Sequence, residues 1–361
     1  MKRRKLAAMT MGTILGLSLI LGGCSSSADT VVEPETKMNP TITKMVDVNE
    51  DMQMVRSDGK VQNNMNGEWV DPEVNERKPI AIMINNIGEA MPQSGIGQAD
   101  VIYEMIVEGG ITRLEAVFTD YSGLTKIGPV RSARQYYVRN AEQLDAFFVH
   151  CGTSTLADNE LARGKVINLD AMGAVGNYMT YRDSSRVAPH NLYTSEEGLN
   201  DALDYTGYDV NHREGFSPMF MFNSENQDLD NGKTANKITT AYSNYRVPYF
   251  EYNSEDKQYY RFQYGDKQID DQTGEQLKFQ NVLILFATTY SVDGYLMEVE
   301  NVGSGAGGYY ATNGSYIPIT WKEEEGTIHY YTEDGKRLKM NPGKTWITYF
   351  DIANQEGVTF E

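Results

Sequence analysis

The sequence has few of the groups that usually mark a chemical class. Two cysteines in 361 residues cannot form the disulfide scaffold of a small secreted domain. Only 32 Lys and Arg stand against 50 Asp and Glu, which gives a net charge of −18. This balance excludes nucleic-acid binding through bulk charge, because phosphate backbones are bound by clustered Lys and Arg.

Recognisable catalytic and cofactor motifs are also missing. The sequence contains no H-E-x-x-H, no G-x-S-x-G and no paired-cysteine metal motif, which argues against zinc proteases and serine hydrolases. Residues 303–308 match G-x-G-x-x-G, but the strand-like segment Tyr309-Tyr-Ala-Thr follows where a dinucleotide site requires a helix. We therefore expect no cofactor and no metal site.

What is present indicates an exported, lipid-anchored protein. Residues 2–5 are basic, an apolar stretch with several interruptions runs from Leu6 to Leu21, and Leu21-Gly-Gly-Cys24 resembles a lipoprotein cleavage site. A transmembrane helix would need about 20 continuous apolar residues. We expect residues 1–23 to be removed, which lowers the net charge to −22, and Cys24 to carry the lipid on the extracytoplasmic face of the cell membrane.

The remaining chain divides by composition into three parts. Residues 24–76 are polar and rich in Pro and Asn, which predicts a flexible tether. Residues 77–235 alternate between strand-like and helix-like segments, which predicts an α/β domain. Residues 236–361 carry strand-like runs separated by turn signals, which predicts a mostly antiparallel all-β domain and an α+β chain overall.

The α/β segment yields specific expectations for its elements. Strands are predicted at Ile80–Ile84, 111–121 and 146–150, and helices at 131–145 and 155–163. Residues 98–108 fit the spacing of a helix and that of a strand. A helix gathers Asp100, Glu104 and Glu108 on one side, and we favour it over a strand despite the β-branched residues.

The segment Ile127-Gly-Pro-Val-Arg131-Ser132-Ala-Arg134-Gln135 is the most informative one. Ser132 followed three residues later by Gln135 is a capping-box pattern, which predicts that the helix begins at Ser132. Arg131 and Arg134 would then add positive charge to a helix N-terminus that already attracts anions. Either an acidic side chain of the protein or a bound phosphate, carboxylate or sulfate-like group would satisfy them.

Two further groups of polar residues are candidates for the site. The acidic residues 100, 104 and 108 require cations nearby, and Arg113 with the 131/134 pair would supply them; general acid/base work by Asp100 or Glu104 is the alternative. The loop of residues 181–194 concentrates binding groups, namely Arg182, Arg186, His190 and Asn191. His190 is a candidate catalytic residue, and a purely structural hydrogen bonder is the alternative.

Several unbroken motifs resemble the YerB-like lipoproteins of Gram-positive bacteria. They are Arg77-Lys-Pro-Ile-Ala-Ile-Met-Ile-Asn85, Pro92-Gln-Ser-Gly95, Ala99-Asp-Val-Ile-Tyr-Glu104, Val107-Glu-Gly-Gly-Ile-Thr-Arg113, the 127–134 segment and Ala188-Pro-His-Asn191. The resemblance implies a surface lipoprotein of two linked domains and supplies no activity. A looser similarity of layout connects the chain to the LytR-CpsA-Psr phosphotransferases.

Two functions remain open from the sequence. In one, the protein is a non-enzymatic binding or assembly lipoprotein: the arginines and His190 hold an anionic envelope polymer or another anionic envelope partner, while the Tyr-rich β domain contacts a cell-wall glycan or an envelope protein. In the other, the same arginines stabilise charge while an envelope phosphotransferase or hydrolase acts on a lipid-pyrophosphate or glycan-phosphate substrate.

Overall fold

The computed structural model describes residues 55–361. The expected export signal and Cys24 lie outside the described residues. None of the helices in this part of the chain has the length and apolar character needed to cross a membrane.

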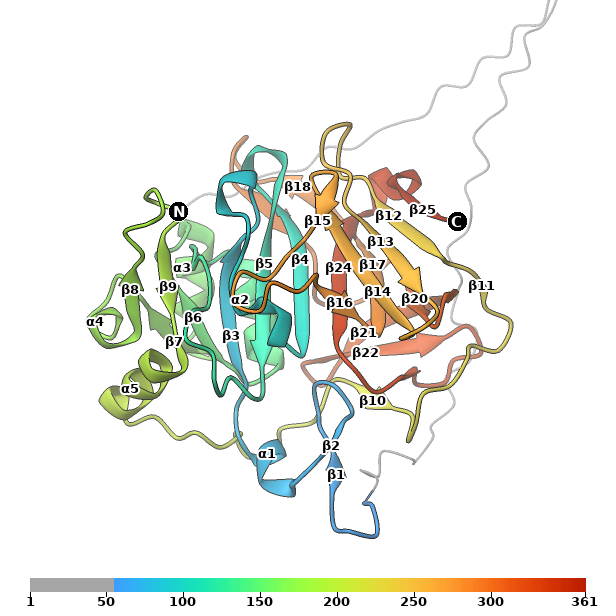
Figure 1. The fold of residues 1–361 in the computed structure, drawn as a ribbon, viewed down its shortest axis with the longest axis horizontal. Helices are drawn as coiled ribbons and strands as arrows, with labels where there is room; N and C mark the ends of the chain where they lie inside the picture. Colours follow the sequence, from blue (N-terminus) through green and yellow to red (C-terminus); the bar gives the residue numbers. More distant parts are fainter. Residues whose placement is uncertain (1–54) are drawn as a thin grey trace, which may run out of the picture. The chain divides into compact units, whose positions relative to one another are not determined.

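One mixed sheet of 11 strands runs through both halves of the chain, in the order β11-β21-β20-β17-β24-β4-β5-β3-β6-β7 with β22 added to β21 (Figure 1). The N-terminal half supplies β3 (Ile80–Asn85), β4 (Val101–Val107), β5 (Ile111–Phe118), β6 (Phe147–His150) and β7 (Ile167–Asp170). The C-terminal half supplies β11 (Lys233–Thr234), β17 (Asn281–Ala287), β20 (Gly308–Thr312), β21 (Ser315–Glu324), β22 (Thr327–Thr332) and β24 (Thr345–Asp351). Strand β24 pairs with β4 in parallel, so the expected boundary near residue 235 does not interrupt the sheet.

Helices and smaller sheets cover this central sheet. The helices are α1 (Pro72–Glu76), α2 (Gln135–Gln143), α3 (Thr155–Leu161), α4 (Gly176–Met179) and α5 (Glu196–Thr206). A second, antiparallel sheet contains β12 (Lys237–Thr240), β13 (Tyr249–Asn253), β14 (Gln258–Gln263), β15 (Asp266–Lys267), β16 (Lys278–Phe279) and β25 (Val358–Phe360). Short pairs join β1 (Val61–Gln62) to β2 (Trp69–Val70), β8 (Thr180–Arg182) to β9 (Leu192–Thr194), β10 (Met221–Phe222) to β23 (Lys339–Met340) and β18 (Thr289–Ser291) to β19 (Met297–Val299). The α+β class is confirmed.

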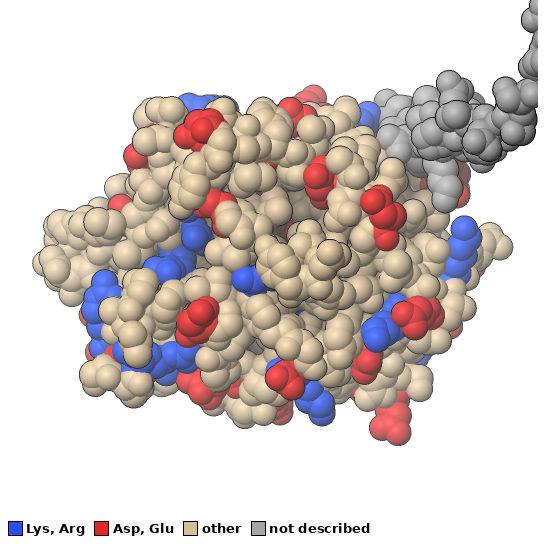
Figure 2. All heavy atoms as spheres, turned by 90° about the horizontal axis from the view of Figure 1, so that it is seen from above, with Lys and Arg blue, Asp and Glu red and all other residues tan. Residues whose placement is uncertain are grey.

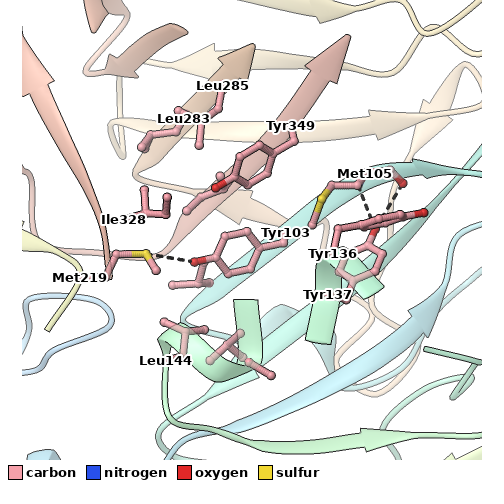
Figure 3. Packing of buried hydrophobic residues seen from close by; sticks show 14 of the residues in the cluster. Tyr103, Met105, Tyr136, Tyr137, Leu144, Met219, Leu283, Leu285, Ile328 and Tyr349 are labelled. Carbon is pink, nitrogen blue, oxygen red and sulfur yellow. Dashed lines mark hydrogen bonds between the residues drawn. The ribbon is translucent and has the colours of Figure 1, made fainter. Parts of the chain in front are cut away.

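The core on one face of the central sheet is built from both halves. Tyr136 and Tyr137 of α2 pack with Tyr103 of β4 and Tyr349 of β24 (Figure 3). Tyr137 Oη accepts the Met105 backbone N–H at 2.9 Å, so a buried polar group is satisfied inside the apolar layer. Helix α2 is thereby fixed against the middle of the sheet.

The other face carries a buried ion pair beneath the second sheet. Arg261 Nη2 of β14 donates to Glu104 Oε2 of β4 at 2.7 Å, and both side chains are 0% exposed. Glu104 Oε1 also accepts from Thr112 Oγ1 at 2.8 Å. The Arg261 guanidinium lies 4.7 Å from the ring centroid of Phe250 and 4.5 Å from that of Trp346, so aromatic faces compensate part of its desolvation.

The predicted helix over 98–108 is wrong, because these residues form β4. Val101, Tyr103 and Met105 enter one core and Ile102 the other. A strand that is buried on both faces loses the apolar–polar alternation by which strands are recognised. The spacing of its few polar residues can then match that of an amphipathic helix.

The predicted helix start at Ser132 is also wrong. Helix α2 begins at Gln135 with Arg134 as its N-cap residue. The backbone before it is extended because it pairs with its neighbours: Arg131 N donates to Met83 O, and Ala133 N donates to Gly152 O. This pairing outweighs the local preference for a capping box.

The folded region begins before Arg77, so the predicted tether is too long at its C-terminal end. Residues 61–76 form β1, β2 and α1, and Met65 is 1% exposed in the core. Asn66 Nδ2 donates to Asp100 Oδ1 at 2.6 Å, which attaches this hairpin to the sheet.

Replacing Glu104 by Ala should destabilise the protein by about 3–5 kcal/mol, because it leaves the Arg261 charge buried without its partner. The free energy of unfolding in urea measures the effect. Glu251→Ala, at an exposed position of the neighbouring strand β13, is the control and should change stability by less than about 0.5 kcal/mol. Equal effects of the two changes would contradict the argument.

Glu115 should make stability depend on pH. Burial raises the pKa of Glu115 well above its usual value, and Asn140 is the one side chain that donates to it among residues 55–361. The unfolded state loses this proton near pH ~4.3, so stability falls as the pH rises from there toward the folded-state pKa. The variant Glu115→Gln should therefore gain stability relative to the wild type between about pH 4 and pH 8 in urea titrations. Parallel curves for the two proteins would refute this.

Candidate functional site

The candidate residues gather at one edge of the central sheet. Strands β3, β4, β6 and β7 run in the same direction, and their carboxyl ends carry Asn85, Glu108, Cys151 and Asp170. Ligands of open α/β sheets bind outside the carboxyl ends of the strands. Figure 2 shows the molecule from the top of Figure 1, and Lys and Arg atoms are grouped on the left of this face.

Arg131 and His190 meet at the centre of the group. Arg131 Nη2 lies 3.4 Å from His190 Nδ1, and Asn85 Nδ2 lies 2.7 Å from the same nitrogen. Two N–H donors directed at Nδ1 place the ring proton on Nε2. Burial and the positive charges of Arg131 and Arg186 lower the pKa of His190, so the neutral imidazole has an Nε2–H to donate.

Three arginines of the group have no acidic partner in the part of the chain that the structure describes. Arg131 Nη1 donates to Pro189 O at 3.5 Å, Arg182 Nη1 to Asn191 Oδ1 at 2.8 Å, and Arg186 Nη1 to Pro92 O at 2.9 Å. Within residues 55–361 none of these three guanidinium groups forms an ion pair. Neutral acceptors leave their charges uncompensated.

Arg131 is the most constrained of the three. Burial lowers its pKa, and the charges of Arg134 and Arg182 lower it further. Its Nε is buried and has no hydrogen-bond partner among the described residues. A cation held against other cations is stabilised when an anion binds beside it.

Arg134 and Arg113, in contrast, already have structural roles. Arg134 Nε and Nη2 bind the Glu108 carboxylate at 2.7 to 2.9 Å in a bidentate pair. Burial raises the pKa of Glu108, but Arg134 and Arg113 bring it below the usual value. Arg113 donates to the Ser132 carbonyl, and burial with the Arg134 charge lowers its pKa to about 10. An acidic side chain of the protein thus satisfies Arg134, as one of the two sequence alternatives anticipated.

The carboxylates proposed from sequence as catalytic groups bind other parts of the fold. Asp100 accepts from Asn66, from Thr119 N and from Thr119 Oγ1, the last two at 2.7 Å. The Glu104 carboxylate forms an ion pair with Arg261. Because β4 is a strand, these residues and Glu108 do not form the helical stripe that the sequence suggested. His190 is the candidate catalytic residue that remains beside Arg131.

Some site residues escaped the sequence reasoning. Asn85 ends a buried apolar strand, and the polar residue at a strand's carboxyl end is the signal that could have identified it. Cys151 lies between the charges of Arg131 and Arg182, yet burial raises the pKa of its thiol. No group of three or more metal-ligating side chains occurs among residues 55–361.

Comparison with known proteins adds the family. Residues 65–209 match "Protein of unknown function (DUF3048) N-terminal domain", and residues 238–347 match the corresponding C-terminal domain. The chain belongs to the DUF3048 family. The N-terminal match of this DUF3048 protein begins at Met65, which agrees with a folded region that starts before Arg77.

A relative of this DUF3048 protein, YerB of Bacillus subtilis, is matched both in sequence and in structure. The chain is 33% identical over 308 residues to "Putative lipoprotein YerB" of strain 168, covering 83% of this chain and 91% of the relative. The crystal structure of YerB protein from Bacillus subtilis matches with a TM-score of 0.73 and 28% identity, covering 83% of this chain and 99% of that one. The YerB-like resemblance is confirmed, and the name of this relative gives no activity.

The contacts of His190 predict its titration. The imidazole should titrate below the ordinary histidine pKa of about 6.5 as the Nε2–H tautomer. Replacing Arg131 by Gln should raise the His190 pKa, because it removes a positive charge next to the ring. Long-range ¹H–¹⁵N NMR reports both quantities, with Arg163→Gln at a distant exposed ion pair as the control. An Nδ1–H tautomer would contradict the proposed hydrogen bonds.

Proposed function

We propose that this DUF3048 protein is a lipid-anchored envelope protein that binds an anionic group of a cell-envelope molecule through Arg131, Arg182, Arg186 and His190. The observation that carries the proposal is the set of three arginines that have no acidic partner among residues 55–361, in a chain whose net charge is −18. With 50 acidic residues available, the Arg134–Glu108 pair illustrates how readily such a charge can be neutralised internally.

The geometry suits an oxyanion with several oxygens. Guanidinium groups donate pairs of parallel N–H bonds to phosphate and carboxylate oxygens. The unbonded Nε of Arg131 and the Nε2–H of His190 are further donors at the same place. A phosphate-like group would accept from several of them at once and neutralise the charges that oppose one another.

The anchor rests on the Leu21-Gly-Gly-Cys24 motif and on the name of the Bacillus subtilis relative. A lipid on Cys24 would hold the folded region near the membrane surface, where phosphate-bearing lipids and wall polymers are the abundant anions. Binding is favoured over catalysis because Asp100 and Glu104, the acidic candidates for proton transfer, are committed to Asn66, Thr119 and Arg261.

Arg131→Gln should weaken the binding of inorganic phosphate and pyrophosphate at least about tenfold, because a charge-assisted hydrogen bond is worth roughly 1.5–3 kcal/mol. Isothermal titration calorimetry on the purified protein measures the dissociation constants. Arg163→Gln removes an exposed arginine that pairs with Glu142 and Glu160, and it should leave them unchanged. Absence of phosphate and pyrophosphate binding by the wild type, or equal binding by Arg131→Gln, would refute the anion site.

A further inference from the structure

A second hollow opens at the same edge of the sheet. It has a volume of about 500 Å³ and lies at the carboxyl ends of β4 and β24. Its walls include aromatic rings, amides and carboxylates, among them Tyr242, Asn244, Phe350, Asp351, Asn354 and Glu356. Pockets of roughly 300–1,000 Å³ hold small-molecule ligands in other proteins.

The hollow and the arginine cluster are linked through β4 and the residues that follow it. Ile106 lines the hollow, and Glu108 follows two residues later, about 7 Å further along the chain. Glu108 binds Arg134, which is three residues from Arg131. Tyr245, in the segment that forms one wall of the hollow, reaches the backbone at Gly110. A ligand longer than a single phosphate can therefore extend from one compartment toward the other.

The two compartments differ in chemistry. No Lys or Arg lines the hollow, whereas it contains the carboxylates of Asp351 and Glu356, which would repel an anion. Asp351 Oδ1 accepts the Ala353 N–H at 3.1 Å, and within the described part of the chain neither carboxylate forms an ion pair. Asn244 is exposed, and its side chain forms no hydrogen bond with residues 55–361 that would compete with a ligand.

Carboxylates and amides beside aromatic rings suit a neutral polyhydroxylated group. The hydroxyls of a sugar donate to carboxylate and amide oxygens and accept from amide N–H groups. The apolar C–H face of a sugar ring packs on an aromatic ring. An ammonium group would also suit the carboxylates and the amide oxygens, but it has no acceptor for the side-chain N–H groups of Asn244, whereas Asn354 Nδ2 already donates to Ala241 O.

We infer that the hollow is the saccharide compartment of the binding face, and that the ligand is a sugar chain bearing a phosphate or similar anion. This inference rests on the proposed function, because the anionic group occupies the arginine cluster while the sugar occupies the hollow. The same chemistry occurs in a free sugar phosphate and in a sugar phosphate borne by a lipid.

Calorimetry with three soluble probes tests the inference: inorganic phosphate, lactose, and lactose 1-phosphate. Lactose 1-phosphate should bind the wild type at least about tenfold tighter than inorganic phosphate does. The double variant Asn244→Ala/Glu356→Ala, at two exposed positions, should lose this advantage and keep the affinity for inorganic phosphate. The control Asn211→Ala/Glu255→Ala removes the same groups at exposed positions outside the hollow and should bind all probes like the wild type.

The outcomes separate the two proposals. Equal binding of phosphate and lactose 1-phosphate, or a double variant that keeps the advantage, overturns the saccharide compartment and leaves the anion site intact. Lactose binding without any phosphate binding overturns the anion site instead. If tetramethylammonium weakens the binding of lactose 1-phosphate and lactose does not, the hollow binds a cation and the inference is overturned.

A vesicle experiment identifies the source of the sugar phosphate. Co-sedimentation with phosphatidylcholine vesicles that contain phosphatidylinositol, lost in Asn244→Ala/Glu356→Ala, supports the inference with a lipid-borne ligand. Binding of lactose 1-phosphate without co-sedimentation supports it with a free chain.

Discussion

The ion pair between Glu104 and Arg261 is the interaction on which the arrangement of the two halves depends. A carboxylate from β4 and a guanidinium from β14 are both removed from water, and each is tolerated because the other lies 2.7 Å away. The register of β4 against β24 places Glu104 opposite Thr348, two residues beyond Trp346, whose ring lies against the guanidinium. The N- and C-terminal family domains are therefore parts of one sheet with a shared core.

This shared sheet explains why the proposed binding face contains residues from both family domains. The arginine cluster contacts the carboxyl end of β3 through Asn85 and His190, and the carboxyl ends of β4 and β24 carry the hollow. Strand β4 borders both compartments. A loss of the Glu104–Arg261 pair would thus disturb the face as well as stability, because β4 would lose the contact that holds it beneath the second sheet.

Sequence reasoning predicted those parts of the fold that depend on local composition. The strand at residues 80–84 was predictable because five apolar residues in succession, three of them β-branched isoleucines, are typical of a short strand that is covered on both faces. The strand within residues 98–108 was not predictable, because Glu104 can be buried there only through its ion pair with Arg261, which lies 157 positions away in the sequence. The same limit applies to Ser132, since its extended backbone results from neighbours at Met83 and Gly152.

The sequence predicted which residues belong to the candidate site, but it did not predict which of the charged residues pair with one another. The sequence identified Arg131, Arg134 and His190, but which arginine keeps a free charge depends on the position of Glu108, and that position follows from β4 being a strand. In a helix the carboxylate at 108 would share a face with Glu104, but β4 ends at Val107, and Glu108 in the turn that follows pairs with Arg134. Because Arg134 is paired, Arg131 is the arginine of this segment that keeps an uncompensated charge. Arg131 and Asn85 both donate to His190 Nδ1 and thereby fix its tautomer. Among residues 55–361 a carboxylate pairs with Arg134 and none pairs with Arg131, so in the anion site that we propose the selectivity would come from the position of the charges rather than from the net charge. Its acidic surroundings, including Asp351 and Glu356 in the adjacent hollow, would repel ligands that are anionic along their whole length and favour those whose charge is confined to one end.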